Sequence, residues 1–200
     1  MGDETYIPDA SMAERGRSSG EGRGGTYLLT WTTYGTWLPG DSRGFVSPVP
    51  CEDGGCVIHN VVGSAYDADM PSLMEKARAR MRGVRVVLDR ANARVCADAF
   101  GEVERRGDVR VLVGAIMATH VHLVVASTSL EGAALLQRFK GVSSRRLTQR
   151  FGKPGAPSWW TRHGSRRLLT NAPSVDGALR YVWEQIGALV VWRASDERAG

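Results

Sequence analysis

Residues 109–126 read V-R-V-L-V-G-A-I-M-A-T-H-V-H-L-V-V-A, and this stretch decides the fold. Two apolar runs rich in valine, at 109–117 and 120–126, are separated only by Ala118 and Thr119. Such runs predict β-strands, and strands joined so closely pair in the antiparallel sense. We therefore expect a β-hairpin near the middle of the chain.

The segments around this hairpin predict two long helices. Apolar residues recur every three or four positions over 86–106, as on one face of a helix, and Gly107 can end it. A second helix is expected from a cap at Ser129 to Gly152. Its apolar stripe comprises Leu135, Leu136, Phe139, Val142 and Leu147.

The remaining elements complete the fold class. Strands are expected at 26–33 and 165–170, a short basic helix at 72–82, and a last helix from a cap at Ser174 to about residue 190. Apart from the short basic helix, the order before the last helix is strand, helix, strand, strand, helix, strand. We therefore predict an α+β fold with a ferredoxin-like antiparallel sheet (β-α-β-β-α-β) plus a C-terminal helix.

A chain of 200 residues can bury a core in a single domain, which we place at 26–192. Residues 1–25 are rich in Gly, Ser, Arg and Glu and are expected to form a disordered arm. Prolines and glycines punctuate an irregular insertion at about 42–85, and residues 193–200 form a tail.

Cys51, Cys56 and His59 form the pattern C-x4-C-x2-H, which partly resembles a zinc site. The spacing is irregular and no fourth ligand is evident, so we interpret the cysteines as reduced thiols in a loop. No apolar run reaches the roughly 20 residues that span a bilayer. We expect a cytoplasmic, nucleoid-associated protein with no membrane partner.

The charge is distributed unevenly along the chain. The whole sequence has a net charge of +5, yet residues 132–175 contain no Asp or Glu. A block of this kind predicts a polyanionic partner, and interleaved tryptophans favour nucleic acid. The alternative is a solvated basic face. The expected DNA-binding residues are Arg138, Lys140, Arg145, Arg146, Arg150, Trp160, Arg162, Arg166 and Arg167.

His120 and His122 lie two positions apart in a predicted strand, so their side chains point to the same face. Two imidazoles on one face can bind one metal ion, although they can also be unrelated histidines on a solvent-facing surface. On the last helix, Tyr181 and Gln185 are four residues apart and share a face other than the apolar stripe of Leu179, Val182 and Ile186. Tyr181 can equally be an amphipathic residue at the helix boundary.

Together these four residues predict a metal-assisted reaction at phosphorus. His120, His122 and Gln185 offer two nitrogens and an oxygen, a set that suits Mg²⁺ or Mn²⁺ when waters complete the shell. Open coordination positions are what a catalytic metal needs to bind a phosphate oxygen. Tyr181 would be the nucleophile, and no water needs to be activated.

The same residues resemble a known family. His120-Val121-His122 is similar to the HUH motif, and Y-V-W-E-Q at 181–185 is similar to the Y-x-x-x-Q helix of single-tyrosine HUH transposases. The stretches at 30–41 (T-W-T-T-Y-G-T-W-L-P-G-D) and 159–165 (W-W-T-R-H-G-S) resemble the branch of REP-associated tyrosine transposases. Thr119 stands where that family pattern has Asn, and His163 stands where it has a small residue.

This resemblance implies a metal-dependent transposase that nicks and rejoins single-stranded hairpin DNA from a palindromic repeat. Tyr181 would form a 5′-phosphotyrosine intermediate, and the protein would act as a monomer or a homodimer. The alternatives are a catalytically silent hairpin-binding protein, a rolling-circle-type replication initiator, and a ferredoxin-like domain that binds a protein partner. Intact His120, His122, Tyr181 and Gln185 favour the enzyme.

Overall fold

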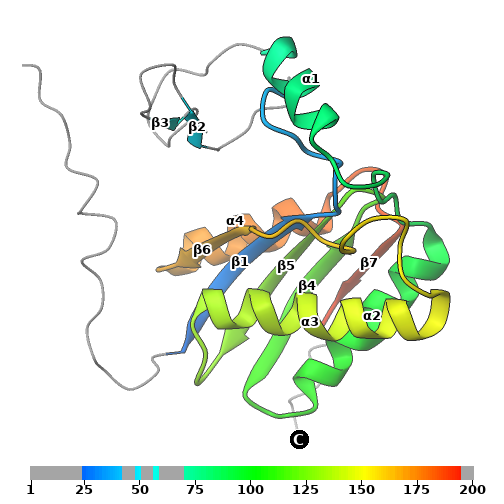
Figure 1. Ribbon diagram of the computed structural model, residues 1–200. Helices are drawn as coiled ribbons and strands as arrows, with labels where there is room; N and C mark the ends of the chain where they lie inside the picture. The colour runs from blue at the N-terminus through cyan, green and yellow to red at the C-terminus, as the bar shows by residue number, and fades with distance from the viewer. Residues whose placement is uncertain (1–23, 42–47, 51–55, 59–69, 195–200) are drawn as a thin grey trace, which may run out of the picture.

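The protein is described by a computed structural model over residues 24–41, 48–50, 56–58 and 70–194 (Figure 1). Its centre is a five-stranded sheet with the order β6-β1-β5-β4-β7, in which every neighbouring pair is antiparallel. These strands are β1 (Gly25–Thr32), β4 (Val109–Ile116), β5 (His120–Ser127), β6 (Ser165–Leu169) and β7 (Val190–Arg193).

The helices α2 (Arg90–Glu104) and α3 (Gly132–Phe151) pack on one face of the sheet, and α4 (Ala172–Trp183) packs on the other (Figure 1). Trp31, Val121 and Leu123 point to the first face and join the core with Phe100 and Phe139 of the two helices. The opposite face carries a smaller apolar cluster under α4. The predicted ferredoxin-like order β1-α2-β4-β5-α3-β6 is confirmed.

The sheet is extended by a strand that the sequence pattern did not predict. The last helix, expected to reach about residue 190, ends at Trp183, and β7 then pairs with β4. A turn through Gly187, with φ at 79°, separates the two elements. Trp192 of β7 packs on Gly114, where an added Cβ would lie 2.3 Å from the indole ring. Ile186, predicted to be buried, is 95% exposed because it lies in this turn.

Three helix starts differ from prediction, two of them because of their capping. The helix expected from residue 86 begins at Arg90, where Asp89 and Asn92 form a reciprocal capping box. In α4 the cap is Asn171, and Ser174 is its partner within the first turn. Ser129 does not cap α3, and its hydroxyl instead donates to Asp108.

The insertion at 42–85 is described only in part. It contains the short strands β2 (Pro48–Pro50) and β3 (Cys56–Ile58), which pair with each other, and the helix α1 (Pro71–Ala79). Residues 1–23 of the predicted disordered arm, most of the predicted tail and the Cys51, Cys56 and His59 side chains lie outside the described residues, whereas Gly25 begins β1.

Candidate active site

The two histidines of the H-x-H motif lie side by side on the face of the sheet that α4 covers. Their ring centroids are 4.8 Å apart. His122 is buried, whereas Val121 and Leu123, on either side of it in sequence, point into the core under α2 and α3. Strand alternation therefore separates two functions along β5: odd-numbered residues build the core, and the histidines face a site.

Each histidine is held through Nδ1 by a threonine hydroxyl. Thr30 Oγ1 lies 2.8 Å from His122 Nδ1, and Thr119 Oγ1 lies 3.0 Å from His120 Nδ1. In the tautomer that carries the hydrogen on Nδ1, each imidazole donates to the hydroxyl and its Nε2 lone pair is left to bind a cation. The role of Thr30 was not predicted from the sequence, and Thr119 stood out there only as a departure from a family pattern.

The environment of His122 favours a neutral imidazole. Burial, and then the neighbouring His120, lower the pKa of His122 from 6.5 to about 4. A neutral imidazole is the form that ligates metal ions, so His122 does not need to lose a proton at neutral pH before it can bind one.

Tyr181 reaches this histidine pair from α4. Ala178 and Val182 bury one side of the helix against the sheet, and Tyr181 lies on the flank of that side. Its ring centroid is 5.3 Å from that of His122, at an interplanar angle of 77°. The Tyr181 side chain is 49% exposed, so its ring contacts the site while the residue remains accessible to a large substrate.

The sequence predicted Gln185 on the last helix. In the structure, Gln185 lies just beyond the end of α4. Its side-chain NH₂ donates to the backbone carbonyl of Tyr181 over 3.1 Å. This hydrogen bond uses the amide nitrogen, so the carboxamide oxygen is the atom that suits a cation. Gln185 is thereby tied to the same residue that carries the phenol.

The donor types suit a divalent ion. Two imidazole nitrogens and one amide oxygen would give three protein ligands and would leave coordination positions for water and phosphate. Within the described ranges, no group of three or more His, Cys, Asp or Glu residues is placed to hold a metal. Trp37, which the sequence analysis quoted only within a motif, packs its ring edge-on near His120 at 6.3 Å.

The structure divides the predicted DNA-binding residues into two groups. Arg138 pairs with Asp108 at 3.1 Å, and Arg146 pairs with Glu102 at 2.6 Å. The Lys140 ammonium donates to three backbone carbonyls of residues 161–163. The remaining arginines have exposed side chains: Arg145, Arg150, Arg162, Arg166 and Arg167.

Trp160 is not available as an open stacking platform, which corrects one prediction. The residue is only 3% exposed, and its indole N–H donates to Ser143 Oγ over 3.1 Å. It packs edge-on against Trp31 in the core. Trp159 is buried as well, and it donates to Thr148. Both tryptophans therefore anchor the loop before β6 to α3.

The basic residues lie on both faces of the sheet. Arg167 pairs in register with Leu28, which packs in the cluster under α4, so Arg167 shares the face of the histidines. Arg166 points to the opposite face, where its Cβ approaches Gly132 of α3. The arginines of α3 itself also lie on that opposite side. Sequence spacing alone could not distinguish these two groups.

The comparisons with known proteins identify the family of this chain. The family model of IS200-like transposases matches residues 79–185, a range that includes both histidines and extends from α1 to Gln185. The chain therefore belongs to the IS200-like transposase family, whose members are DNA-processing enzymes. No curated protein sequence matches the chain.

One similar solved structure is a REP-associated tyrosine transposase bound to a REP hairpin. It is 10% identical to this chain, with a TM-score of 0.43, and the match covers 83% of this chain and 68% of that one. In the described part of the chain, no helix is long and apolar enough to cross a membrane.

Proposed function

We propose that this protein is a metal-dependent transposase that nicks and rejoins single-stranded DNA through a covalent bond to Tyr181. One observation carries the proposal. In a member of the IS200-like transposase family, Tyr181 and the histidine pair, about sixty residues apart in sequence, converge so that the rings of Tyr181 and His122 are 5.3 Å apart. A binding module has no need for that convergence.

The chemistry follows from the residues present. The phenol oxygen of Tyr181 attacks the phosphorus of a phosphodiester, and the bond to the 3′ oxygen of the preceding nucleotide breaks. The phenolic proton leaves to solvent, and the departing 3′ oxygen takes up a proton from solvent. The products are a 5′-phosphotyrosine and a free 3′-hydroxyl. Because the phosphodiester bond energy is kept, a 3′-hydroxyl can attack the phosphotyrosine and rejoin the strand without an added energy source.

His120, His122 and Gln185 would hold Mg²⁺ or Mn²⁺ beside this tyrosine. An ion bound there would polarise the scissile phosphate and favour the phenolate form of the nucleophile. Thr30 and Thr119 keep the imidazoles oriented, and the Gln185 hydrogen bond to the Tyr181 carbonyl keeps the third ligand next to the nucleophile.

The substrate we propose is hairpin DNA from a palindromic repeat, in line with the motifs at 30–41 and 159–165 that resemble REP-associated tyrosine transposases. Arg167, exposed on the face of β6 that carries the histidines, supplies a phosphate contact close to the site. Because Tyr181 and the histidines converge within one chain, we propose that a single chain forms a complete active site and acts on nucleoid DNA in the cytoplasm.

A denaturing gel tests this function directly. Wild-type protein is incubated with labelled single-stranded hairpin DNA from its own genomic neighbourhood, with Mn²⁺ or with EDTA. We expect a DNA band shifted by covalently attached protein, present with Mn²⁺ and absent with EDTA.

Two variants identify the nucleophile. Tyr181→Phe should bind the hairpin and form no adduct, whereas Tyr27→Phe, on the opposite face of the sheet, should form the adduct as wild type does. Wild-type protein that binds these hairpins but never forms an adduct would instead establish a hairpin-binding protein without catalysis.

A further inference from the structure

The turn that follows β1, residues 33–37 (T-Y-G-T-W), lies next to the first histidine of the candidate active site. Gly35 occupies the third position of this turn with φ at 70°, a left-handed conformation that glycine adopts without strain. The chain therefore reverses between Thr33 and Thr36, and the Thr36 hydroxyl donates to the Thr33 carbonyl over 3.0 Å. The two threonine side chains consequently lie together, with their hydroxyl oxygens 2.9 Å apart.

Both threonines face the carbonyl of Thr119, the residue before the first histidine. The backbone N–H of Thr33 donates to this carbonyl over 2.9 Å, and the hydroxyl oxygens of Thr33 and Thr36 each lie 3.1 Å from it. Each hydroxyl has one hydrogen to donate, and either can give it to the Thr119 oxygen. That oxygen can thus accept from the Thr33 N–H and from one hydroxyl, which uses both of its lone pairs.

Thr119 holds His120 with its own side chain. Thr119 Oγ1 lies 3.0 Å from His120 Nδ1, so the position of the Thr119 backbone determines where this hydroxyl meets the ring. Thr119 lies in the turn between β4 and β5, and the carbonyl before it is fixed as well, because the N–H of Leu88 donates to the Ala118 carbonyl over 2.8 Å. A single residue therefore connects the turn after β1 to the His120 ring.

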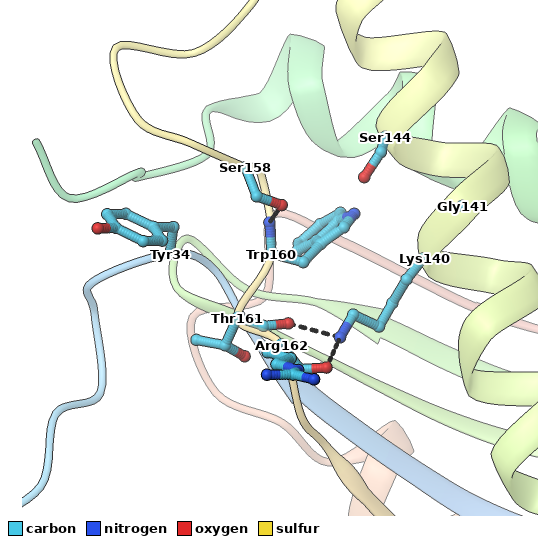
Figure 2. Close-up of a pocket in the computed structure, with 8 residues that line it drawn as sticks. All are labelled: Tyr34, Lys140, Gly141, Ser144, Ser158, Trp160, Thr161 and Arg162. Atoms are coloured by element: carbon cyan, nitrogen blue, oxygen red, sulfur yellow. Dashed lines mark hydrogen bonds between the residues drawn. The ribbon is translucent and has the colours of Figure 1, made fainter. Parts of the chain in front are cut away.

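A second contact from the turn after β1 reaches the histidine ring directly. The ring centroid of Trp37 lies 6.3 Å from that of His120, at an interplanar angle of 78°. Tyr34 anchors the turn elsewhere: its ring lies to one side of Trp160 (Figure 2), and its hydroxyl accepts the backbone N–H of Arg82 over 2.9 Å. The turn is thus fixed to other parts of the fold through Tyr34 and contacts the histidine through Trp37.

We propose that the hydroxyls of Thr33 and Thr36 position a metal ligand. They fix the backbone of Thr119, whose own hydroxyl binds Nδ1 of His120 and leaves Nε2 to face the ion. The inference rests on the proposed function, because that function makes His120 a metal ligand. It extends the metal site from the strand that carries the histidines to the turn after β1.

Paired substitutions test this role by removing the hydroxyls while keeping the side-chain shape. The double variant Thr33→Val, Thr36→Val leaves the Thr119 carbonyl with only the Thr33 N–H. Calorimetric titration with Mn²⁺ in the absence of DNA should show about a tenfold lower affinity, the low end of the effect of an orienting partner. The double variant Thr33→Ser, Thr36→Ser keeps both hydroxyls and should bind Mn²⁺ as wild type does.

Thr36→Val alone covers the case in which the double valine variant does not fold. Thr36 is half-buried, whereas Thr33 is fully buried. The single variant should lose part of the Mn²⁺ affinity, and less than the double variant, because the Thr33 hydroxyl still reaches the Thr119 carbonyl.

Thr161→Val is the matched control at the same end of the sheet. The Thr161 hydroxyl lies 3.0 Å from Thr32 Oγ1 and 3.2 Å from the Thr32 carbonyl, so its loss changes contacts with β1 and not with Thr119. The Thr161 carbonyl accepts from Lys140 (Figure 2), a backbone contact that the substitution keeps. This variant should bind Mn²⁺ with wild-type affinity.

The tautomer of His120 gives a second measurement, which a change in stability alone would not move. Nitrogen-15 NMR of the imidazoles should show the His120 hydrogen on Nδ1 in wild-type protein and a mixture of tautomers in the double valine variant. The chain has only four histidines, and His120→Gln assigns the signal.

Four results would overturn the proposal: wild-type Mn²⁺ affinity in the folded valine variants, an equal loss in Thr161→Val, no Mn²⁺ binding by wild-type protein, or a hydrogen on Nε2 of His120 in wild-type protein. None of these measurements requires DNA or cleavage. Failure of the proposed function appears separately, as wild-type protein that binds Mn²⁺ and a hairpin but forms no Tyr181 adduct.

Discussion

The hydroxyl of Thr30 on β1 lies 2.8 Å from Nδ1 of His122 on β5, and the two residues are direct partners in the register of the two strands. The contact sets which ring nitrogen of His122 remains for a metal. It joins residues 92 positions apart in sequence and is part-buried. The hydrogen bond therefore helps to fix the orientation of the His122 ring.

Replacing Thr30 with Val should therefore weaken metal binding while the fold survives. Loss of an orienting partner of this kind costs about 10–100-fold in metal affinity. Calorimetric titration with Mn²⁺ measures the change. Thr30→Ser keeps the hydroxyl and should restore most of the affinity, and Thr26→Val on the same strand should leave it unchanged. Equal affinity in Thr30→Val and wild type would show that packing alone orients His122.

Lys140 is expected to act on stability more than on DNA affinity. Its ammonium donates to the carbonyls of Thr161, Arg162 and His163, and burial lowers its pKa below the ordinary lysine value. Lys140→Met keeps the aliphatic stem but leaves these carbonyls without their donor, so the free energy of unfolding should fall by about 1–3 kcal/mol.

Urea unfolding of Lys140→Met, compared with Lys153→Met in the loop after α3, measures this loss. Full stability together with a weaker salt dependence of DNA binding would make Lys140 a phosphate contact, as the sequence analysis predicted.

Glu104 should make the folded protein less stable as the pH rises. Its Oε1 accepts the backbone N–H of Val111 over 2.8 Å, and burial raises the pKa of Glu104. A folded-state pKa above the ordinary value means that the folded protein binds this proton more tightly than the unfolded chain. Stability is therefore lost as the pH rises from the ordinary glutamate pKa through the raised one.

Glu104→Gln keeps an oxygen acceptor and removes the charge, so it should be more stable than wild type at neutral pH, with the gain disappearing in acid. Urea unfolding over a pH series checks this. Glu102→Gln is a control of opposite sign, because the hydrogen bond from Arg146 lowers the Glu102 pKa. A gain for Glu104→Gln that does not vary with pH would point to packing as its cause.

Arg167 and Arg146 should differ in their effect on DNA binding. Arg167 is exposed on the face of the histidines, whereas Arg146 is paired with Glu102 on the other side of the sheet. Arg167→Ala should reduce the slope of log affinity against log salt by roughly 0.7–0.9, as for one lost phosphate contact. Arg146→Ala should leave the slope unchanged. A slope that is reduced by Arg146→Ala and unchanged by Arg167→Ala would place the DNA along α3.

The central elements were predictable because their signals are local. The alternation in β5 assigned His120 and His122 to one face, and the spacing in the last helix placed Tyr181 off its apolar stripe. The same spacing was wrong about Ile186, because the helix ends at Trp183 and β7 follows. That ending depends on Trp192 packing on Gly114, a contact between two strands far apart in the sequence.

Residue spacing was sufficient to predict the order of strands and helices in the ferredoxin-like unit. It was also sufficient to place His120 and His122 on one face of their strand, because both predictions follow from side-chain directions within short segments. Strand register and packing between distant segments decided the rest. They brought Tyr181 to His122, supplied Thr30 from another strand, buried Trp160 and separated Arg166 from Arg167. These outcomes depend on which distant segments contact one another, and residue spacing within a short segment does not specify those contacts.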